Sequence, residues 1–279
     1  MGLFMNKSPK PAFLPDEMRS LQQAWLGTSL GQYLLAKEQA LYDQAVVDLF
    51  GFNALQMGFL QMDLLKNSRI PNRFKSSEFS NEPIENHLRC SDEFLPFADM
   101  SLDLLILPHR LEFSERPHQT LREAERVMMP EGHLLISGFN LFSTWGIMAA
   151  VSRRLSCRKS LAKKFPPRFP WCGEFISLAR MKDWLKLLGF EIVSVQMNCH
   201  VPPFEQAIWH KRFTFMDRLA ERCCTMLGGV YFIVAKKRVV GMTPLKPNWK
   251  KAPIKSALVI KPTQSRPSQR KPLKQNNQK

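Results

Sequence analysis

A run of aliphatic residues near the middle of the chain, SLDLLIL from Ser101 to Leu107, most limits what this sequence can fold into. A strand that is apolar at nearly every position is buried on both faces, as the strands of parallel sheets are. Pro108 ends the run, an amphipathic helix is expected over Pro117–Met129, and a second buried strand is expected over His133–Ser137. This centre predicts an α/β fold in which helices cover a sheet.

The same alternation continues on both sides of the centre. A short apolar segment ends at Gly58, which predicts a buried strand followed by a tight strand-to-helix turn. Downstream, a helix is expected over Ile176–Leu188, and strands are expected over Phe190–Val195 and Val230–Ala235. Strands alternating with helices predict a doubly wound sheet, which binds ligands at the carboxyl ends of its strands.

The segments around this α/β region differ from it in composition. Residues 1–16 are polar and interrupted by prolines, and we expect a flexible N-terminal arm. Apolar spacing over residues 17–49 predicts N-terminal helices that pack on the core, with breaks at Gly27 and Gly31. The α/β domain is expected over residues 50–240, and a disordered basic tail over residues 241–279.

Most of the formal charge of +16 lies in that tail. From Lys236 to Lys279 there are thirteen Lys or Arg and no Asp or Glu, so residues 1–235 carry a net charge of only +3. Such a polycation attracts nucleic acid, ribosomes or anionic lipid without specificity. The alternative is a solubilising extension without a partner. A second basic stretch, Arg153–Arg168, is interpreted as an insertion over the ligand edge or as a solvated surface.

Several classes of protein and site are disfavoured by the sequence. The six cysteines form no CxxC pair and no metal-ligand spacing with histidine, so we expect no metal site, free thiols and a reducing compartment. No run of about 18 apolar residues and no signal peptide is found, which predicts a cytoplasmic protein without a transmembrane segment. No GxGxxG follows a strand, which disfavours a dinucleotide oxidoreductase.

The segment Leu95–Asn140 resembles the core of class I methyltransferases of the methyltransferase type 11 family. The approach LPF and SLD to the fourth strand, the loop His109–Glu112 and the turn Pro130–Gly132 follow one another in the family's order. With the later helix-to-strand step, the resemblance spans about residues 45–237. It implies a Rossmann-like, methyltransferase-like domain with a doubly wound mixed sheet over residues 50–240, which uses S-adenosylmethionine.

The resemblance also implies which loops hold this cofactor. In the turn after the first strand, Gly58 is the remaining glycine, and Gln56 stands where the family has an acid. The amide of Gln56 can accept a hydrogen bond from the methionine ammonium group of the cofactor. In the loops after the third and fourth strands, cofactor contacts are expected from Ser91, Asp92, Glu93, Leu107 and Pro108.

His109 follows the fourth strand, where the resemblance implies that an acceptor meets the methyl donor. A neutral imidazole there suits a general base or a substrate ligand, and a residue that caps the backbone is the alternative. Glu112 is expected to pair with Arg110 or Arg122, or to bind a cationic substrate group. His109 is therefore the candidate catalytic residue.

Two more side chains are candidates for contact with the acceptor. Asn140 follows the fifth strand, where a turn is the alternative role. Trp145 can stack on a planar acceptor, with a core or lid anchor as the alternative. Asp103, at the start of the fourth strand, is expected to be structural.

Two functions of different classes follow from these observations. The first is an S-adenosylmethionine-dependent methyltransferase, in which an unidentified acceptor attacks the sulfonium methyl group in line. The alternative is a catalytically inactive methyltransferase-like protein that binds RNA or ribosomes through its basic segments.

Overall fold

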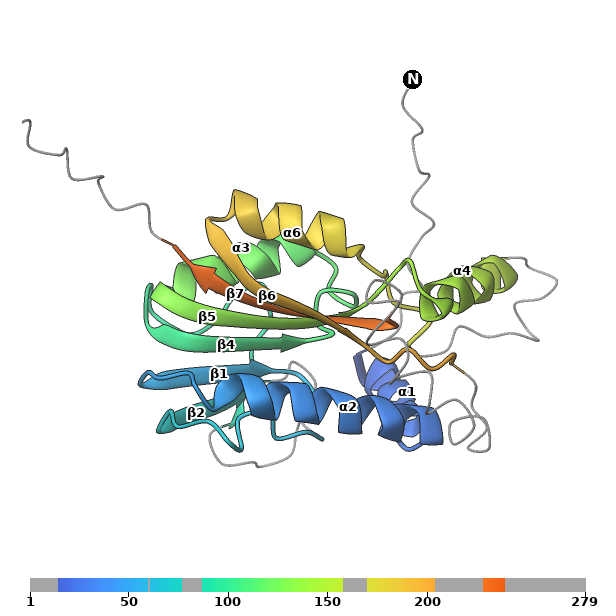
Figure 1. Cartoon of the computed structure of the whole chain (residues 1–279), viewed down its shortest axis with the longest axis horizontal. Coiled ribbons are helices and arrows are strands. Elements are labelled where there is room, and N and C mark those ends of the chain that lie inside the picture. The colour runs from blue at the N-terminus through green and yellow to red at the C-terminus, as the bar shows by residue number, and fades with distance from the viewer. Residues whose placement is uncertain (1–14, 60, 77–86, 158–169, 204–227, 239–279) are drawn as a thin grey trace, which may run out of the picture. The chain divides into compact units, whose positions relative to one another are not determined.

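The computed structural model of the chain describes residues 15–59, 61–76, 87–157, 170–203 and 228–238 (Figure 1). All of them fall within one unit of the chain, Met1–Val240. Their elements are, in order, α1 (Pro15–Leu26), α2 (Ser29–Val46), β1 (Asn53–Met57), β2 (Asn72–Ser76), β3 (His87–Leu88), β4 (Leu102–Pro108), α3 (Pro117–Val127), β5 (Met128–Phe139), α4 (Thr144–Cys157), α6 (Leu178–Leu187), β6 (Phe190–Asn198) and β7 (Val230–Lys237).

The strands form one seven-stranded sheet in the order β3-β2-β1-β4-β5-β7-β6. Strands β1 to β5 pair in parallel, and β7 is antiparallel to its neighbours β5 and β6. This arrangement confirms the doubly wound sheet that the alternation of strands and helices predicted, and the Rossmann-like mixed sheet that the resemblance implied. Because parallel strands end on the same side, the residues that follow β1, β3, β4 and β5 lie along one carboxyl edge.

Alternate residues of the central strands pack into two separate hydrophobic clusters. Ala54, Leu104 and Ile106 pack with residues of α1 and α2, and Leu105 and Leu107 pack with residues of α3 and α6. Figure 1 shows α2 on one side of the sheet and α3 and α6 on the other. Both faces of β4 are therefore buried, which explains its nearly continuous aliphatic sequence.

The N-terminal helices break once, at Gly27–Thr28. The backbone N–H of Gly31 donates to Thr28 Oγ1 at 3.2 Å, and this bond caps α2. Gly31, the second expected break, lies inside α2, where a Cβ atom would overlap the backbone of Trp25 and Leu26. This glycine therefore allows the end of α1 to approach α2. Helix α1 begins at Pro15, two residues before the expected start.

The junction between α3 and β5 differs from the expectation. The helix expected over Pro117–Met129 ends at Val127, and the strand expected from His133 begins at Met128. The backbone N–H of Ser101 donates to the Val127 carbonyl at 2.8 Å, so the chain turns directly into pairing beside β4. Tertiary strand pairing, rather than the Pro130–Gly132 turn, therefore ends the helix.

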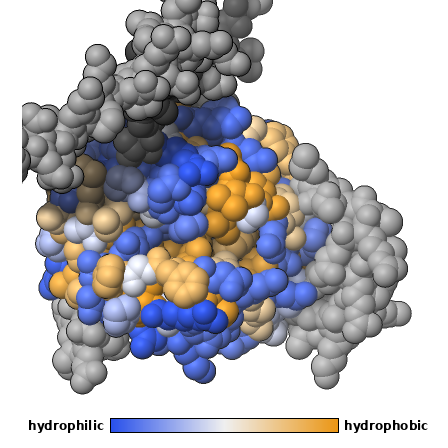
Figure 2. All heavy atoms as spheres, turned by 60° about the vertical axis from the view of Figure 1, so that its left-hand side comes forward, coloured by the Kyte–Doolittle hydropathy of each residue, from blue (hydrophilic) through white to orange (hydrophobic). Residues whose placement is uncertain are grey.

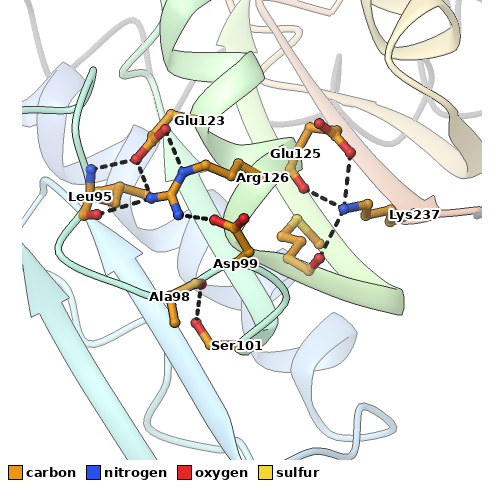
Figure 3. Close-up of polar contacts among 9 residues, drawn as sticks. Leu95, Ala98, Asp99, Ser101, Glu123, Glu125, Arg126 and Lys237 are labelled. Atoms are coloured by element: carbon orange, nitrogen blue, oxygen red, sulfur yellow. Dashed lines mark hydrogen bonds and ion pairs between the residues drawn. The ribbon is translucent and has the colours of Figure 1, made fainter.

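Side chains of α3 fix this junction (Figure 3). Arg126 donates to Glu123 at 2.6 and 3.0 Å and to Asp99 at 2.5 Å. Glu123 in turn accepts the backbone N–H of Leu95 at 2.8 Å. The Glu123 and Arg126 pair thus has a structural role. Lys237 Nζ, from β7, donates to the carbonyls of Glu125 and Met128.

The helix expected over Ile176–Leu188 and the two strands expected after it are present, and both strands are longer than expected. Helix α6 lies within the expected helix, and Ser177 caps it by accepting from the backbone N–H of Arg180. Strands β6 and β7 extend to Asn198 and Lys237. Within the described ranges, no helix combines the length and the apolar character needed to cross a membrane. The arm before residue 15, the tail from residue 241 and residues 158–168 of the basic stretch lie outside those ranges.

Candidate active site

Gly58 forms the turn that follows β1 at the carboxyl edge. Its φ of +77° is in the left-handed region, and its N–H donates to the Ser76 carbonyl at the end of β2 at 2.7 Å. A Cβ atom at this position would lie 2.8 Å from Cδ of Arg110. The turn therefore requires a residue without a side chain, both for its backbone conformation and for the close approach of Arg110.

Gln56 holds the loop that comes next. Its Nε2 donates to the carbonyls of Gly58, Phe59 and Met62, at 3.2, 3.2 and 2.8 Å. Its Oε1 accepts the Leu64 N–H at 3.0 Å, and the whole side chain is buried. A carboxylate could not donate to three carbonyls, which explains the amide at this position.

The helix expected after this turn is absent: residue 59 and residues 61–71 form turns without a helix. The bonds from Gln56 satisfy backbone carbonyls of this loop that a helix would pair internally. No helix dipole is therefore available beside Gly58 from this stretch of the described chain.

The loops after β3 and β4 meet in an ion pair. Arg110 Nε donates to Asp92 Oδ2 at 2.5 Å, and Asp92 is only 5% exposed. Beside it, Ser91 Oγ accepts the Glu93 N–H at 3.4 Å, and Glu93 pairs with Arg116 at 3.6 Å. The structure thus brings Gly58 and the loops containing Ser91–Glu93 and Leu107–Arg110 to one place. The side chains of Leu107 and Pro108 are buried in the sheet.

His109 lies between two buried carboxylates. Its Nε2 is 2.8 Å from Glu38 Oε1, and its Nδ1 is 3.0 Å from Glu112 Oε2. The other oxygen of Glu112 accepts the backbone N–H of Phe139 at the end of β5. Glu38 is the charged residue on the otherwise apolar buried face of α2. His109 therefore connects α2, the loop after β4 and the end of β5.

The two carboxylates determine the protonation of His109. Burial alone would lower the pKa of the imidazole, but the negative charges of Glu38 and Glu112 outweigh burial and raise the pKa to about 10. The ring is therefore a cation at pH 7, with both N–H groups donating. This differs from the neutral imidazole assumed for a general base, and Glu112 pairs with His109 rather than with Arg110 or Arg122.

Aromatic rings enclose this ionic group. The Phe139 ring lies 4.0 Å from the imidazole and the Phe59 ring 5.5 Å from it, between ring centres. Phe139 also stacks on Trp145 and Phe175, at 5.7 and 4.9 Å. The rings separate the charged triad from water, which strengthens its hydrogen bonds.

The two remaining candidates have internal partners. Asn140 Nδ2 donates to the Gly228 carbonyl at 3.0 Å, and its Oδ1 accepts the Phe142 N–H at 3.1 Å, so it forms a turn. Trp145 is fully buried, and its Nε1 donates to the Val201 carbonyl at 3.0 Å. Both follow β5 at the carboxyl edge, and both are buried with polar atoms bonded to the backbone.

Sequence reasoning missed three residues of this site: Glu38, Arg110 as the partner of Asp92, and Phe139. Glu38 is 71 residues from His109, and an acid within a helix gives no local sign of a distant partner. The available signal was its place among Leu34, Leu41 and Tyr42 on the apolar face of the predicted helix, since a charge there requires a buried partner.

Comparison with known proteins places this site in context. A family model described as a methyltransferase domain matches residues 61–136, a range that begins after Gly58. The uncharacterized protein YafS of Escherichia coli K12 is 30% identical over 254 residues, which cover 89% of this chain and 95% of that protein.

Two solved structures share the fold at 16% identity. One is an S-adenosylmethionine-dependent methyltransferase from Thermotoga maritima, with a TM-score of 0.52 over 79% of this chain and 97% of that one. The other comes from the complex of the Haloferax volcanii Trm112 methyltransferase activator with a methyltransferase. Its TM-score is 0.50, over 78% of this chain and 98% of that one.

Proposed function

This chain belongs to the class I methyltransferase family, whose cofactor is S-adenosylmethionine, and on that premise we propose that it methylates an acceptor at the carboxyl edge of its sheet. One observation carries the proposal. The turn at Gly58, the loop at Asp92 and the loop at His109 follow the parallel strands β1, β3 and β4 and come together at that edge. Ligands of doubly wound sheets bind where such loops converge.

The residues at this edge fit the cofactor in part. Gly58 provides a turn without a side chain, and Asp92 provides a carboxylate beside it that can accept hydrogen bonds from an adenosine group. We assign cofactor contacts to these two residues, to the neighbouring Ser91 and Glu93, and to the backbone of Leu107 and Pro108. The buried side chain of Gln56 holds this turn through its hydrogen bonds to the loop carbonyls. When bound, the cofactor supplies an electrophilic methyl group on a sulfonium ion.

Arg110 compensates for the missing helix. In this fold a helix N-terminus after the first strand lends positive charge to the methionine carboxylate, and the loop after β1 has no such helix. The guanidinium group of Arg110 places a full positive charge next to Gly58 instead. Its ion pair with Asp92 holds it there, and part of that pairing is exchanged for contacts to the cofactor when the cofactor binds.

His109 is proposed to position the acceptor loop rather than to remove a proton. A cation held by two carboxylates has no free nitrogen lone pair for a proton, whereas its bonds fix the loop after β4 against α2 and β5. Asn140 and Trp145 form the adjoining wall of the acceptor site. Catalysis by this chain then rests on positioning and on the exclusion of water.

The function is tested by calorimetric titration of the full chain with S-adenosylhomocysteine. We expect the wild type to bind, and Arg110→Met to bind about tenfold more weakly or worse, because a charge-assisted contact is lost. Arg238→Met is the control, since Arg238 also forms ion pairs, with Glu131 and Glu191, but follows β7 on the surface. Equal binding by Arg110→Met would refute its role while leaving the function intact.

An absence of binding by the wild type at millimolar S-adenosylhomocysteine would refute the proposed methyltransferase function. The alternative, a catalytically inactive protein that binds RNA or ribosomes, would then lead. That alternative depends on the basic segments 153–168 and 241–279, of which residues 158–168 and the whole tail lie outside the described ranges. No contact of the described residues favours it.

A further inference from the structure

Helix α4 has an apolar stripe on its outer face. Its inner face buries Trp145 and Ala149 completely in the core. On the outer face, Ile147, Met148 and Val151 are 65%, 37% and 47% exposed, at the three- and four-residue spacing of one helix face. Phe142, just before the helix, is 70% exposed.

Along the sequence, the charged residues that flank this stripe have one sign. Arg153 and Arg154 follow the stripe within the same helix. In the sequence from Gly132 to Gly173 there are seven Lys or Arg and no Asp or Glu. An apolar stripe bordered by positive charge without acids is the composition of helices that lie in the interface of anionic membranes.

We propose that α4 binds the surface of a bilayer that contains anionic phospholipids, with Phe142, Ile147, Met148 and Val151 inserted below the headgroups. Arg153 and Arg154 would contact the lipid phosphates. A nucleic acid offers phosphates as well, but it provides no apolar layer for the stripe. In Figure 1, α4 lies at the carboxyl end of β5, so the bilayer would lie beside the edge that carries the candidate active site.

Several other exposed apolar side chains lack this combination. Phe50, Phe52 and Met100 are 69%, 73% and 55% exposed near the opposite, amino-terminal ends of β1 and β4. The acids Asp99 and Glu131 are exposed at the same end. Figure 2 shows the side of the molecule that is on the left in Figure 1, where apolar surface is divided by hydrophilic side chains. Leu187 and Val193 are exposed on α6 and β6.

Vesicle sedimentation of the full chain tests the proposal. We expect binding to phosphatidylcholine vesicles that contain phosphatidylglycerol, and little binding to pure phosphatidylcholine. The triple variant Ile147→Ser, Met148→Ser, Val151→Ser removes the stripe. It should lower the vesicle partition coefficient about tenfold or more, because three apolar side chains no longer insert. The double variant Leu187→Ser, Val193→Ser is the matched control, with similar exposure elsewhere, and should bind as the wild type does.

The salt dependence of vesicle binding distinguishes binding through the apolar stripe from binding through the basic tail. Binding through charge alone weakens steeply as salt rises, whereas inserted apolar side chains retain part of the affinity. At high salt, therefore, the difference between the wild type and the triple variant should persist. If the triple variant bound as tightly as the wild type at every salt concentration, the proposal would be overturned. Binding to RNA with no binding to anionic vesicles would overturn it as well.

Discussion

Gly58 and Gly189 have nearly the same backbone conformation, with φ of +77° and +79°, but different surroundings. A Cβ atom at Gly58 would lie 2.8 Å from Arg110 Cδ, whereas at Gly189 its nearest neighbour, the Arg238 carbonyl oxygen, would be at an ordinary 3.5 Å. Alanine at either position should cost about 1–2 kcal/mol of stability, because both glycines are left-handed. Gly58→Ala should in addition weaken S-adenosylhomocysteine binding by about tenfold or more, measured by calorimetry.

Gly189→Ala is the control for this prediction, since it introduces the same backbone strain far from the site. Its cofactor affinity should remain that of the wild type. Equal affinities for the two variants would show that the Gly58 turn does not form part of the cofactor site.

The pKa of His109 predicts how stability depends on pH. The folded chain keeps the proton to about pH 10, while an unfolded histidine releases it near 6.5. The stabilisation is therefore complete below pH 6.5 and is lost as pH rises toward 10, with a slope of up to about 1.4 kcal/mol per pH unit in this window. Urea unfolding of the wild type between pH 7 and 10 measures this loss.

Glu38→Gln should move this loss to lower pH, because the imidazolium then has one carboxylate fewer. Glu191→Gln, which alters an exposed ion pair with Arg238, should leave the shape of the profile unchanged. Identical profiles for the wild type and Glu38→Gln would contradict the assignment of His109 as a buried cation.

Single residues were predictable from sequence where their partners are local. Asp103 was expected to be structural, and its carboxylate accepts the N–H groups of Phe52 and Asn53 at 2.8 and 3.0 Å. Asn140 forms a turn through the nearby Phe142, an alternative left open by its residue type. The charge state of His109 was not predictable, because it depends on Glu38 from a separate helix.

At the scale of elements, the loop after β1 depends on the chemistry of Gln56. Gln56→Glu restores the acid of the family but replaces three donated hydrogen bonds with a carboxylate facing three carbonyls. We expect a loss of about 3 kcal/mol or more in the free energy of unfolding, because buried polar groups are left unpaired. Gln196→Glu, on the exposed face of β6, is the control and should change stability by about 0.5 kcal/mol or less. Denaturant unfolding distinguishes the two, and a neutral Gln56→Glu would contradict the role of the amide.

Periodicity predicted most elements, since β4, α6 and β7 each have the apolar pattern of their final environment. It failed where tertiary contacts decide the outcome. Met128 and Met129 continue the helical pattern of α3, yet Met128 pairs with Leu102 of β4 and both methionines begin β5. The helix expected after Gly58 is absent, and the buried amide of Gln56 binds carbonyls of this segment instead. No local sequence pattern indicates these hydrogen bonds.

At the scale of the whole molecule, the charge of the basic tail and the cofactor affinity of the candidate active site can be tested separately. Removing residues 241–279 deletes ten Lys or Arg and no acid, which leaves a net charge of +6 on residues 1–240. This truncation should weaken binding to a polyanion such as RNA and flatten its salt dependence, while cofactor affinity stays unchanged. Filter binding over a salt series measures the first effect and calorimetry the second. Unchanged RNA affinity and salt slope would instead point to the basic stretch Arg153–Arg168.

The claim that the cofactor lies where β1, β3 and β4 end is tested most directly by hydrogen–deuterium exchange of the full chain with and without S-adenosylhomocysteine. We expect slower exchange in peptides that cover residues 56–64, 90–95 and 107–113, and a much smaller change in Gly58→Ala at a ligand concentration near the dissociation constant of the wild type. Exchange that stays unchanged in these three segments of the wild type, or protection confined to other parts of the chain, would contradict the account.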